Sequence, residues 1–158
     1  MPIKPARTYI AELESDNLGP ISLRIRSNIG ADPVYSVGQK IVLFIEVSRD
    51  RYLYYLYRQS DGSTMRIFPN RFHKSAFIAG NVDQHVPSAA MAFDWVVREP
   101  TGIEIMKCFA FERDIYNELP RLVRKLVFEP LPYRALADLR SIRRVAIAEN
   151  SMMVNVQK

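Results

Sequence analysis

The residues of this chain that could carry out chemistry are scattered along it rather than grouped. Its two histidines, His73 and His85, do not have the spacing of a helical metal-binding pair. The single cysteine, Cys108, lies in an apolar run that is typical of a buried side chain. The glycine-rich phosphate loops, the zinc-binding histidine motif and the nucleophile motif of hydrolases are absent. We therefore expect no catalytic residue, no metal site and no cofactor, and we expect that the protein is not an enzyme.

Asp94 and Glu104 are carboxylates that could still form an acid–base pair. They lie in the apolar-rich segments 91–99 and 103–111, which are joined by the turn-forming sequence PTG and therefore predict a hairpin. The sequence does not decide whether the two side chains face each other across it. A small hydrolase with an unidentified site therefore stays open as an alternative.

Tyrosine is concentrated in the run RYLYYLY at 51–57, and aromatic side chains in a basic protein can stack on nucleic-acid bases. Tyrosines that alternate along a strand also pack within a sheet protein, where their hydroxyl groups reach polar partners. The aromatic signature of RNA-binding sheets does not accompany them. We therefore interpret these tyrosines as core residues.

Positive charge is concentrated in the C-terminal part of the chain. The net charge is +5, and residues 115–158 contain 8 lysines and arginines against 4 aspartates and glutamates. Apolar residues recur at helical spacing within 117–128, which predicts a helix with one buried face and one basic, exposed face. The candidate binding surface comprises Arg121, Arg124, Lys125, Arg140, Arg143 and Arg144. An acidic partner protein is its expected ligand, nucleic acid or another anionic surface is the alternative, and a solvated face without a partner also stays open.

The remaining segments have the pattern of a mainly β protein. Strands are expected at 8–14, 21–27, 40–48, 51–58 and 64–68. Residues 71–90 are expected to form a long connection with one short strand near Phe77 and Ile78. A terminal hairpin is expected at 143–158, and a second short helix at 133–142. We therefore expect a β-sandwich of mostly antiparallel strands with one or two helices inserted near 115–142.

Chain length and apolar patterning bound the organisation of the protein. A chain of 158 residues can bury a conventional core, so one sandwich domain covering 1–158 is expected. The apolar run at 41–45 is far shorter than the roughly 20 residues of a membrane helix, so no transmembrane segment is expected. The N-terminus has no apolar core like that of a signal peptide. We expect a periplasmic or envelope location if a leader was removed, and a cytoplasmic one otherwise.

The segment from Tyr35 to Phe111 contains, in order, YSVGQKIVLFIEVSRDRYLYYLY, DG, IFPN, AG, VP and PTGIEIMKCFAF. This order resembles the family known as domain of unknown function 4384, in which a tyrosine-rich strand runs to a DG turn and a P-x-G-x-E turn leads to the last strand. The resemblance implies these signature positions: Asp61, Gly62, Phe68, Pro69, Asn70, Gly80, Pro87 and Gly102. Turn glycines, a bulky anchor, prolines and an asparagine are typical of a scaffold.

The same resemblance implies a β-sandwich module without established catalytic residues, often attached to exported or envelope-associated bacterial proteins or to larger signalling chains. The expected function is therefore that of a non-catalytic binding or assembly module. Such a module acts through protein–protein contacts, here in a bacterial envelope or secretion-type complex. The partner and the oligomeric state stay open at this stage.

Overall fold

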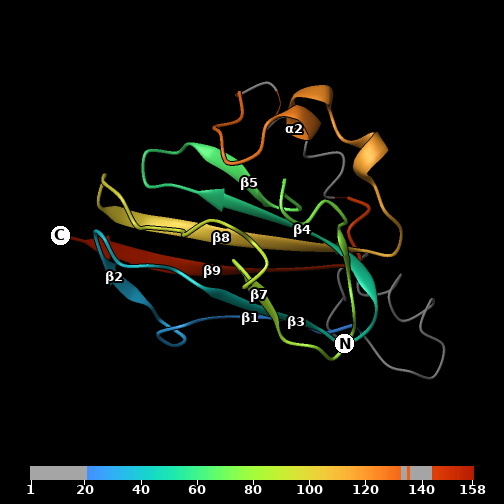
Figure 1. Ribbon diagram of the computed structural model, residues 1–158, viewed down its shortest axis with the longest axis horizontal. Coiled ribbons are helices and arrows are strands. Elements are labelled where there is room, and N and C mark those ends of the chain that lie inside the picture. The colour runs from blue at the N-terminus through green and yellow to red at the C-terminus, as the bar shows by residue number, and fades with distance from the viewer. Residues whose placement is uncertain (1–20, 133–134, 136–143) are drawn as a thin grey trace, which may run out of the picture.

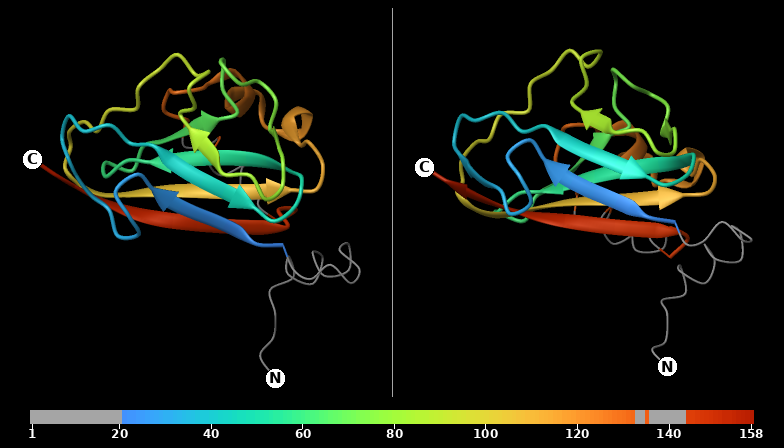
Figure 2. Two further views of the ribbon diagram at one scale, coloured as in Figure 1. Left: turned by 60° about the horizontal axis from the view of Figure 1, so that its bottom comes forward. Right: turned by 90° about the horizontal axis from the view of Figure 1, so that it is seen from below.

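The computed structural model describes residues 21–132, 135 and 144–158. Two β-sheets pack against each other, and short helical elements lie over the larger one (Figures 1 and 2). The strands are β1 (Leu23–Ser27), β2 (Val34–Ser36), β3 (Leu43–Val47), β4 (Arg51–Arg58), β5 (Thr64–Phe68), β6 (Phe77–Ile78), β7 (Gln84–Val86), β8 (Gly102–Phe111) and β9 (Ala148–Gln157). The helical elements are the 3-10 helix η1 (Tyr116–Glu118) and the α-helix α2 (Arg121–Lys125). The expected mainly β, mostly antiparallel sandwich is confirmed.

The smaller sheet has the order β1-β3-β7, and both of its strand pairs are antiparallel. In β3, Leu43, Ile45 and Val47 are fully buried, while the residues between them point to the outer side. This alternation is the period of two that a half-buried strand requires. The strand β7 was not predicted from the sequence, because its three residues lie within the polar connection 71–90 and pair only with β3.

The larger sheet has the order β2-β9-β8-β4-β5, and β6 also pairs with β4. Its strand pairs are antiparallel except for β2, which runs parallel to β9. The free side of β5 is hydrogen-bonded by the chain that follows α2. The Phe128 amide donates to the Arg66 carbonyl at 3.0 Å, and the Leu131 amide donates to the Thr64 carbonyl at 2.8 Å. This contact protects a sheet edge that would otherwise be open to pairing.

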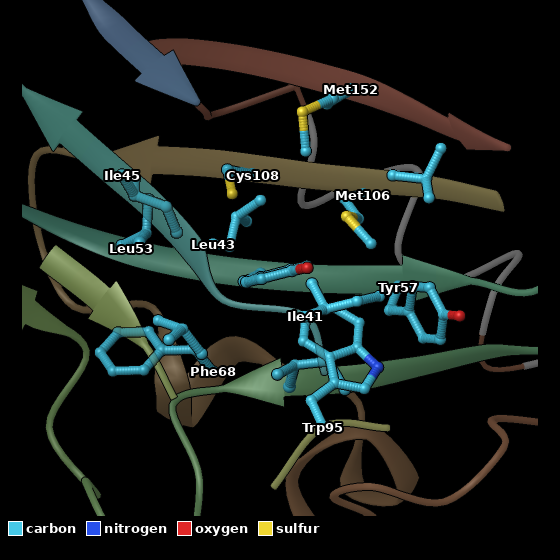
Figure 3. Close-up of a cluster of buried hydrophobic side chains, with 14 of the residues drawn as sticks. Ile41, Leu43, Ile45, Leu53, Tyr57, Phe68, Trp95, Met106, Cys108 and Met152 are labelled. Carbon is cyan, nitrogen blue, oxygen red and sulfur yellow. The ribbon is translucent and has the colours of Figure 1, made fainter. Parts of the chain in front are cut away.

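The main core fills the space between the two sheets (Figure 3). Side chains from β3, such as Ile45, meet side chains from the inner face of the larger sheet, such as Leu53, Met106 and Cys108. Cys108 is fully buried, as its apolar surroundings predicted, and burial raises the pKa of its thiol. Of the four tyrosines expected in the core, Tyr55 and Tyr57 are buried there and Tyr54 is buried in the cluster on the other side of the sheet. Tyr52 is only half-buried and packs against that second cluster.

A second apolar cluster covers one part of the outer face of the larger sheet. Tyr54 and Phe109 point outward from paired positions of β4 and β8. The residues that pack over them come from η1, α2 and the neighbouring chain, and include Ile115, Leu119 and Val123. The apolar side of the predicted helix therefore lies against the sheet.

The helix itself is shorter than the 117–128 that apolar spacing predicted. The chain forms η1, then breaks at Pro120, which has a ψ of 143°, and α2 spans only Arg121–Lys125. Leu126 is already extended, with a ψ of 122°. Proline fits the start of a helix but cannot continue one, so it separates the two short elements.

The predicted hairpin between 91–99 and 103–111 is wrong. Both edges of β8 are occupied, by β4 on one side and β9 on the other. The first segment instead runs beside the chain that leads into β3, where the Ile41 amide donates to the Trp95 carbonyl at 2.8 Å. Only one isolated bridge, Lys40↔Val96, forms there. The buried ring of Trp95 packs 4.7 Å from that of Tyr57, which holds the segment over the core.

The predicted terminal hairpin is also wrong, since β9 is one continuous strand. It pairs with β8 from Ala110↔Ala148 to Gly102↔Val156, so the Asn150-Ser151 pair lies within the ladder rather than at a turn. The expected strand at 8–14 lies outside the described residues, and so does almost all of the expected helix at 133–142. Across the residues that the structure describes, no helix has the length and apolar character needed to cross a membrane.

Candidate functional site

The Asp61-Gly62 turn joins β4 to β5 and is held by local hydrogen bonds. Asp61 Oδ1 accepts from the Ser63 amide at 2.8 Å and from the Ser63 hydroxyl at 2.7 Å, and these bonds lower the pKa of the Asp61 carboxyl. Gly62 has a φ of +89°, which a residue with a side chain rarely adopts. Both residues therefore have a clear role in forming the turn.

Glu104 is a buried carboxyl next to this turn. The Tyr57 hydroxyl donates a hydrogen bond to its Oε1 atom, and the backbone of Ser60 forms a further hydrogen bond. Burial raises the pKa of Glu104, whereas these hydrogen bonds act in the opposite direction. Nearby, Gly102 has a φ of +131°, and a Cβ atom there would lie 3.0 Å from Ser60 Cβ. The arrangement joins the β4–β5 turn to the start of β8.

The segment after β5 is fixed by Asn70. Its side-chain nitrogen donates to the Ile67 carbonyl at 3.0 Å, and its side-chain oxygen accepts from the amides of Phe72 and His73 at 2.9 and 3.0 Å. Phe68, two residues earlier, is buried in the main core. The opening of this loop is therefore rigidly connected to the core.

Two further signature residues lie at close packing points. A Cβ atom at Gly80 would lie 2.4 Å from the Arg49 Cα atom, so only glycine fits against this backbone. Pro87 directly follows the last residue of β7, and its lack of an amide hydrogen prevents the strand from continuing its ladder. These contacts are structural.

The polar residues with potential for chemistry are held apart. Asp94 forms an exposed ion pair with Lys40 at 3.0 Å and does not face the buried Glu104. His73 contacts the ring of Phe68 at 5.0 Å, and His85 contacts Phe44 at 4.5 Å. Within the described ranges, no group of three histidine, cysteine, aspartate or glutamate side chains could hold a metal ion.

Three phenylalanines from distant loops meet at the surface beside β5. The rings of Phe72 and Phe93 are stacked, with centroids 5.7 Å apart, and Phe93 meets Phe128 at 4.7 Å. The Arg71 guanidinium carbon lies 5.4 Å from the centroid of the Phe128 ring. Phe93 and Phe128 pack partly against the main core, while Phe72 is 39% exposed. We call Arg71, Phe72, Phe93 and Phe128 the aromatic surface cluster.

The backbone at Phe128 is in an unfavourable conformation. Its φ is +61°, in the left-handed region that bulky residues rarely adopt. The Phe128 amide is fixed by its hydrogen bond to β5. Strain of this kind costs on the order of 1–3 kcal/mol and often occurs at binding sites. The ring is thus held at the surface by a conformation that the fold must stabilise elsewhere.

The predicted basic surface is only partly exposed. Arg121, Lys125 and Arg144 are exposed, but Arg124 is half-buried and its carbonyl accepts from Arg66 Nη2 at 3.3 Å. Arg140 and Arg143 lie outside the described residues. The expectation that Arg124 projects fully from an exposed helix face is therefore corrected, because α2 is too short and too close to the sheet.

A comparison with sequence models of protein families matches residues 34–114 to the domain of unknown function DUF4384. The matched segment is about half of the chain and includes the signature positions described above. The chain belongs to the DUF4384 family. The resemblance noted from the sequence is thereby confirmed. None of the curated proteins compared with the chain gives a significant match.

The aromatic surface cluster lies partly inside and partly outside the DUF4384 segment. Arg71, Phe72 and Phe93 fall within residues 34–114, whereas Phe128 lies beyond it. Sequence reasoning missed the cluster because its members come from three separate loops. The available signal was a phenylalanine two residues after the FPN motif, in a loop otherwise rich in small and polar residues.

Proposed function

We propose that this protein is a non-catalytic binding module that acts through protein–protein contacts. Its contact surface is the aromatic surface cluster. The observation that carries the proposal is the meeting of three phenylalanines and an arginine at the surface, with Phe128 held in a strained conformation. Aromatic residues and arginine are enriched at protein interfaces and among the residues that dominate binding energy.

The charge around the cluster favours an acidic partner. Arg71 and Lys74 are exposed in the loop that carries Phe72, and Arg121 and Lys125 are exposed on α2. The neighbouring acids are Glu129, directly after Phe128, and Asp94, directly after Phe93, which is paired with Lys40. We further propose that the partner belongs to a bacterial envelope or secretion-type complex, as the family resemblance implies.

The test compares partner capture by the full-length protein and by two variants. Wild type, a variant with Arg71→Glu and Phe72→Ala, and the control Val82→Ala are used as baits in extracts of the native host. Val82 is 47% exposed and has no part in the cluster. The amount of each specific partner captured should fall at least about tenfold with the cluster variant and should stay at the wild-type level with the control.

Stability measurements complete this test. Both variants alter surface residues, so the free energy of unfolding should change by less than about 1 kcal/mol. If the cluster variant retains every partner at the wild-type level, the contact lies elsewhere.

The alternative is binding of nucleic acid or another anionic surface, supported by the exposure of Arg121, Lys125 and Arg144. Salt titration separates the two functions. Binding that neutralises phosphates loses affinity steeply as salt rises, whereas binding through an aromatic cluster loses little.

A further inference from the structure

A second apolar surface, on the outer face of the larger sheet, is left uncovered by the residues that the structure describes. Its apolar side chains are Val34, Ile103, Ile105 and Met153, which we call the open face. Val34 is 46% exposed, Ile103 59% and Met153 67%, while Ile105 is half-buried. Scattered apolar residues are common on protein surfaces, but neighbouring ones on one sheet face indicate a binding surface.

Strand register brings these side chains together. Ile103 pairs with Asn155, which also pairs with Val34, and Ile105 pairs with Met153. Paired residues point to the same side of a sheet, so the four apolar residues lie on adjacent rows across β2, β9 and β8. Side chains at these positions lie close enough to be covered by a single element.

The same sheet face is already covered by a helical segment toward its other end. There Tyr54 and Phe109 lie beneath Leu119 and Val123. Figure 1 shows α2 lying away from the C-terminal end of β9, where the open face begins. The outer face of the sheet therefore carries apolar side chains toward both ends, but the described part of the chain covers only one of these two groups.

The charged side chains that point outward from β4 and β8 beside the open face are positive. Arg58 pairs with Ile105, and Lys107 lies two residues further along β8 on the same face. The outward positions of β2 and β9 nearest the open face are uncharged: Ser36, Ser151, Asn155 and Gln157. Glu149, further along β9, is an outward acid, and it pairs with Phe109 in the covered portion of the face. An occupant with acidic residues beside an apolar stripe would complement this arrangement.

We propose that the open face binds an amphipathic helix of a partner protein, with an apolar stripe flanked by acidic residues. Such a helix would cover the sheet as the helical segment does at the other end. A second copy of this chain is a poorer occupant, because two identical faces would bring Arg58 and Lys107 of both copies together.

The open face is distinct from the aromatic surface cluster. The cluster lies beyond the edge of β5, whereas the open face extends over β2, β9 and β8, with β4 between them and β5. At about 4.8 Å per strand, the two surfaces are separated by about 10 Å or more. The inference therefore goes beyond the proposed function by giving the module a second contact surface.

Two synthetic helical peptides of about 14 residues provide the probes for a direct test. Both carry the same leucine stripe, flanked by glutamates in one peptide and by lysines in the other. Binding to the full-length protein is measured by fluorescence anisotropy. The acidic peptide should bind at least about tenfold more tightly than the basic one.

Three variants locate the binding. Ile103→Asp combined with Met153→Asp should weaken binding of the acidic peptide at least about tenfold, because charged side chains replace the apolar contact. Arg58→Glu combined with Lys107→Glu should reverse the preference between the peptides. The control Val82→Asp should change neither affinity, and circular dichroism should confirm that all variants are folded.

Several results would overturn the proposal. They are equal binding of the two peptides, no binding of either, or acidic-peptide binding that survives the Ile103→Asp and Met153→Asp changes. Binding of phosphatidylglycerol vesicles in place of the acidic peptide would identify a lipid surface instead. If the protein dimerises in analytical ultracentrifugation and Met153→Asp abolishes the dimer, the occupant of the open face would be a second copy of this chain. The Arg71→Glu and Phe72→Ala variant should bind the acidic peptide normally, which separates this test from that of the proposed function.

Discussion

Arg66 shows how a buried polar residue fixes the position of α2. Its guanidinium is buried, and its Nη2 atom donates to the Arg124 carbonyl near the end of the helix. The guanidinium carbon also lies 5.9 Å from the centroid of the Tyr116 ring. Among the described residues its Nε and Nη1 atoms have no hydrogen-bond acceptor, and burial lowers the pKa of Arg66. The cation is thus stabilised mainly by a helix carbonyl and an aromatic ring.

The burial of Glu104 leads to a prediction about how the stability of the protein depends on pH. Burial raises its pKa above the ordinary value of 4.5, so the folded protein holds this proton more tightly than the unfolded chain. The associated stability is fully present below pH 4.5 and is lost as pH rises through the raised pKa. Wild type should therefore lose stability relative to Glu104→Gln as pH rises through this window.

Denaturant unfolding of both proteins at several pH values measures this difference. The amide of the variant changes the hydrogen bonds with Tyr57 and Ser60, so the informative quantity is the pH dependence of the difference and not its size at one pH. Tyr57→Phe serves as a control, because it removes the hydroxyl while keeping the carboxyl. A wild type that gains stability relative to Glu104→Gln over the same range would contradict the assigned direction of the pKa shift.

At the scale of elements, local sequence patterns correctly predicted the strands that pair with the next strand along the chain. The alternation in 51–58 and the Asp61-Gly62 turn predicted β4, its reversal and β5. The segment 91–99 has similar apolar content, but β8 has β4 and β9 as neighbours, and both pairings are long-range. A short sequence window does not show which segments compete to pair with β8. A strand at 91–99 and a hairpin with 103–111 were therefore predicted where neither forms.

The candidate site was less predictable than the fold for the same reason. Phe72, Phe93 and Phe128 are far apart in the chain and meet only after three loops are placed. Basic residues were easier to recognise, but the contact of Arg124 with Arg66 depends on how α2 docks. Charge could be read from composition, whereas exposure could not.

Val123 tests whether α2 is held by the sheet or is stable alone. An isolated helix of this length is not stable in water, and Val123 is buried beneath it. Val123→Asp should release η1 and α2, so their amides should exchange with deuterium at least about tenfold faster. The amides of β8 around Cys108 should keep their protection.

Lys125→Asp is the matched control for this exchange experiment. It places the same acid on an exposed position of α2 and should leave exchange nearly unchanged. Equal protection of η1 and α2 in both variants would show that the segment does not depend on burial of Val123.

For the whole molecule, the positive charge and the two proposed surfaces have different effects. The net charge of +5 produces a field that attracts an acidic partner from a distance. The aromatic surface cluster and the open face make contact only after encounter. Changes in charge should therefore act on association, and changes in apolar contacts on dissociation.

Arg121 and Lys125 allow this separation to be tested with a partner captured through the aromatic surface cluster. Arg121→Glu combined with Lys125→Glu should leave the free energy of unfolding within about 0.5 kcal/mol per substitution, because both side chains are exposed. Association should slow by about tenfold at low salt while dissociation stays unchanged, and the difference should shrink as salt screens the field. Phe72→Ala should instead speed dissociation. The control Arg24→Glu with Arg26→Glu makes the same change in net charge on β1, in the smaller sheet. It also removes the ion pairs with Glu46 and Asp83, so circular dichroism must show that this variant is folded. If this control slows association as much as the Arg121→Glu and Lys125→Glu variant does, net charge rather than the field near the cluster controls encounter. If the Arg121→Glu and Lys125→Glu variant changes only dissociation, these two basic residues belong to the contact itself.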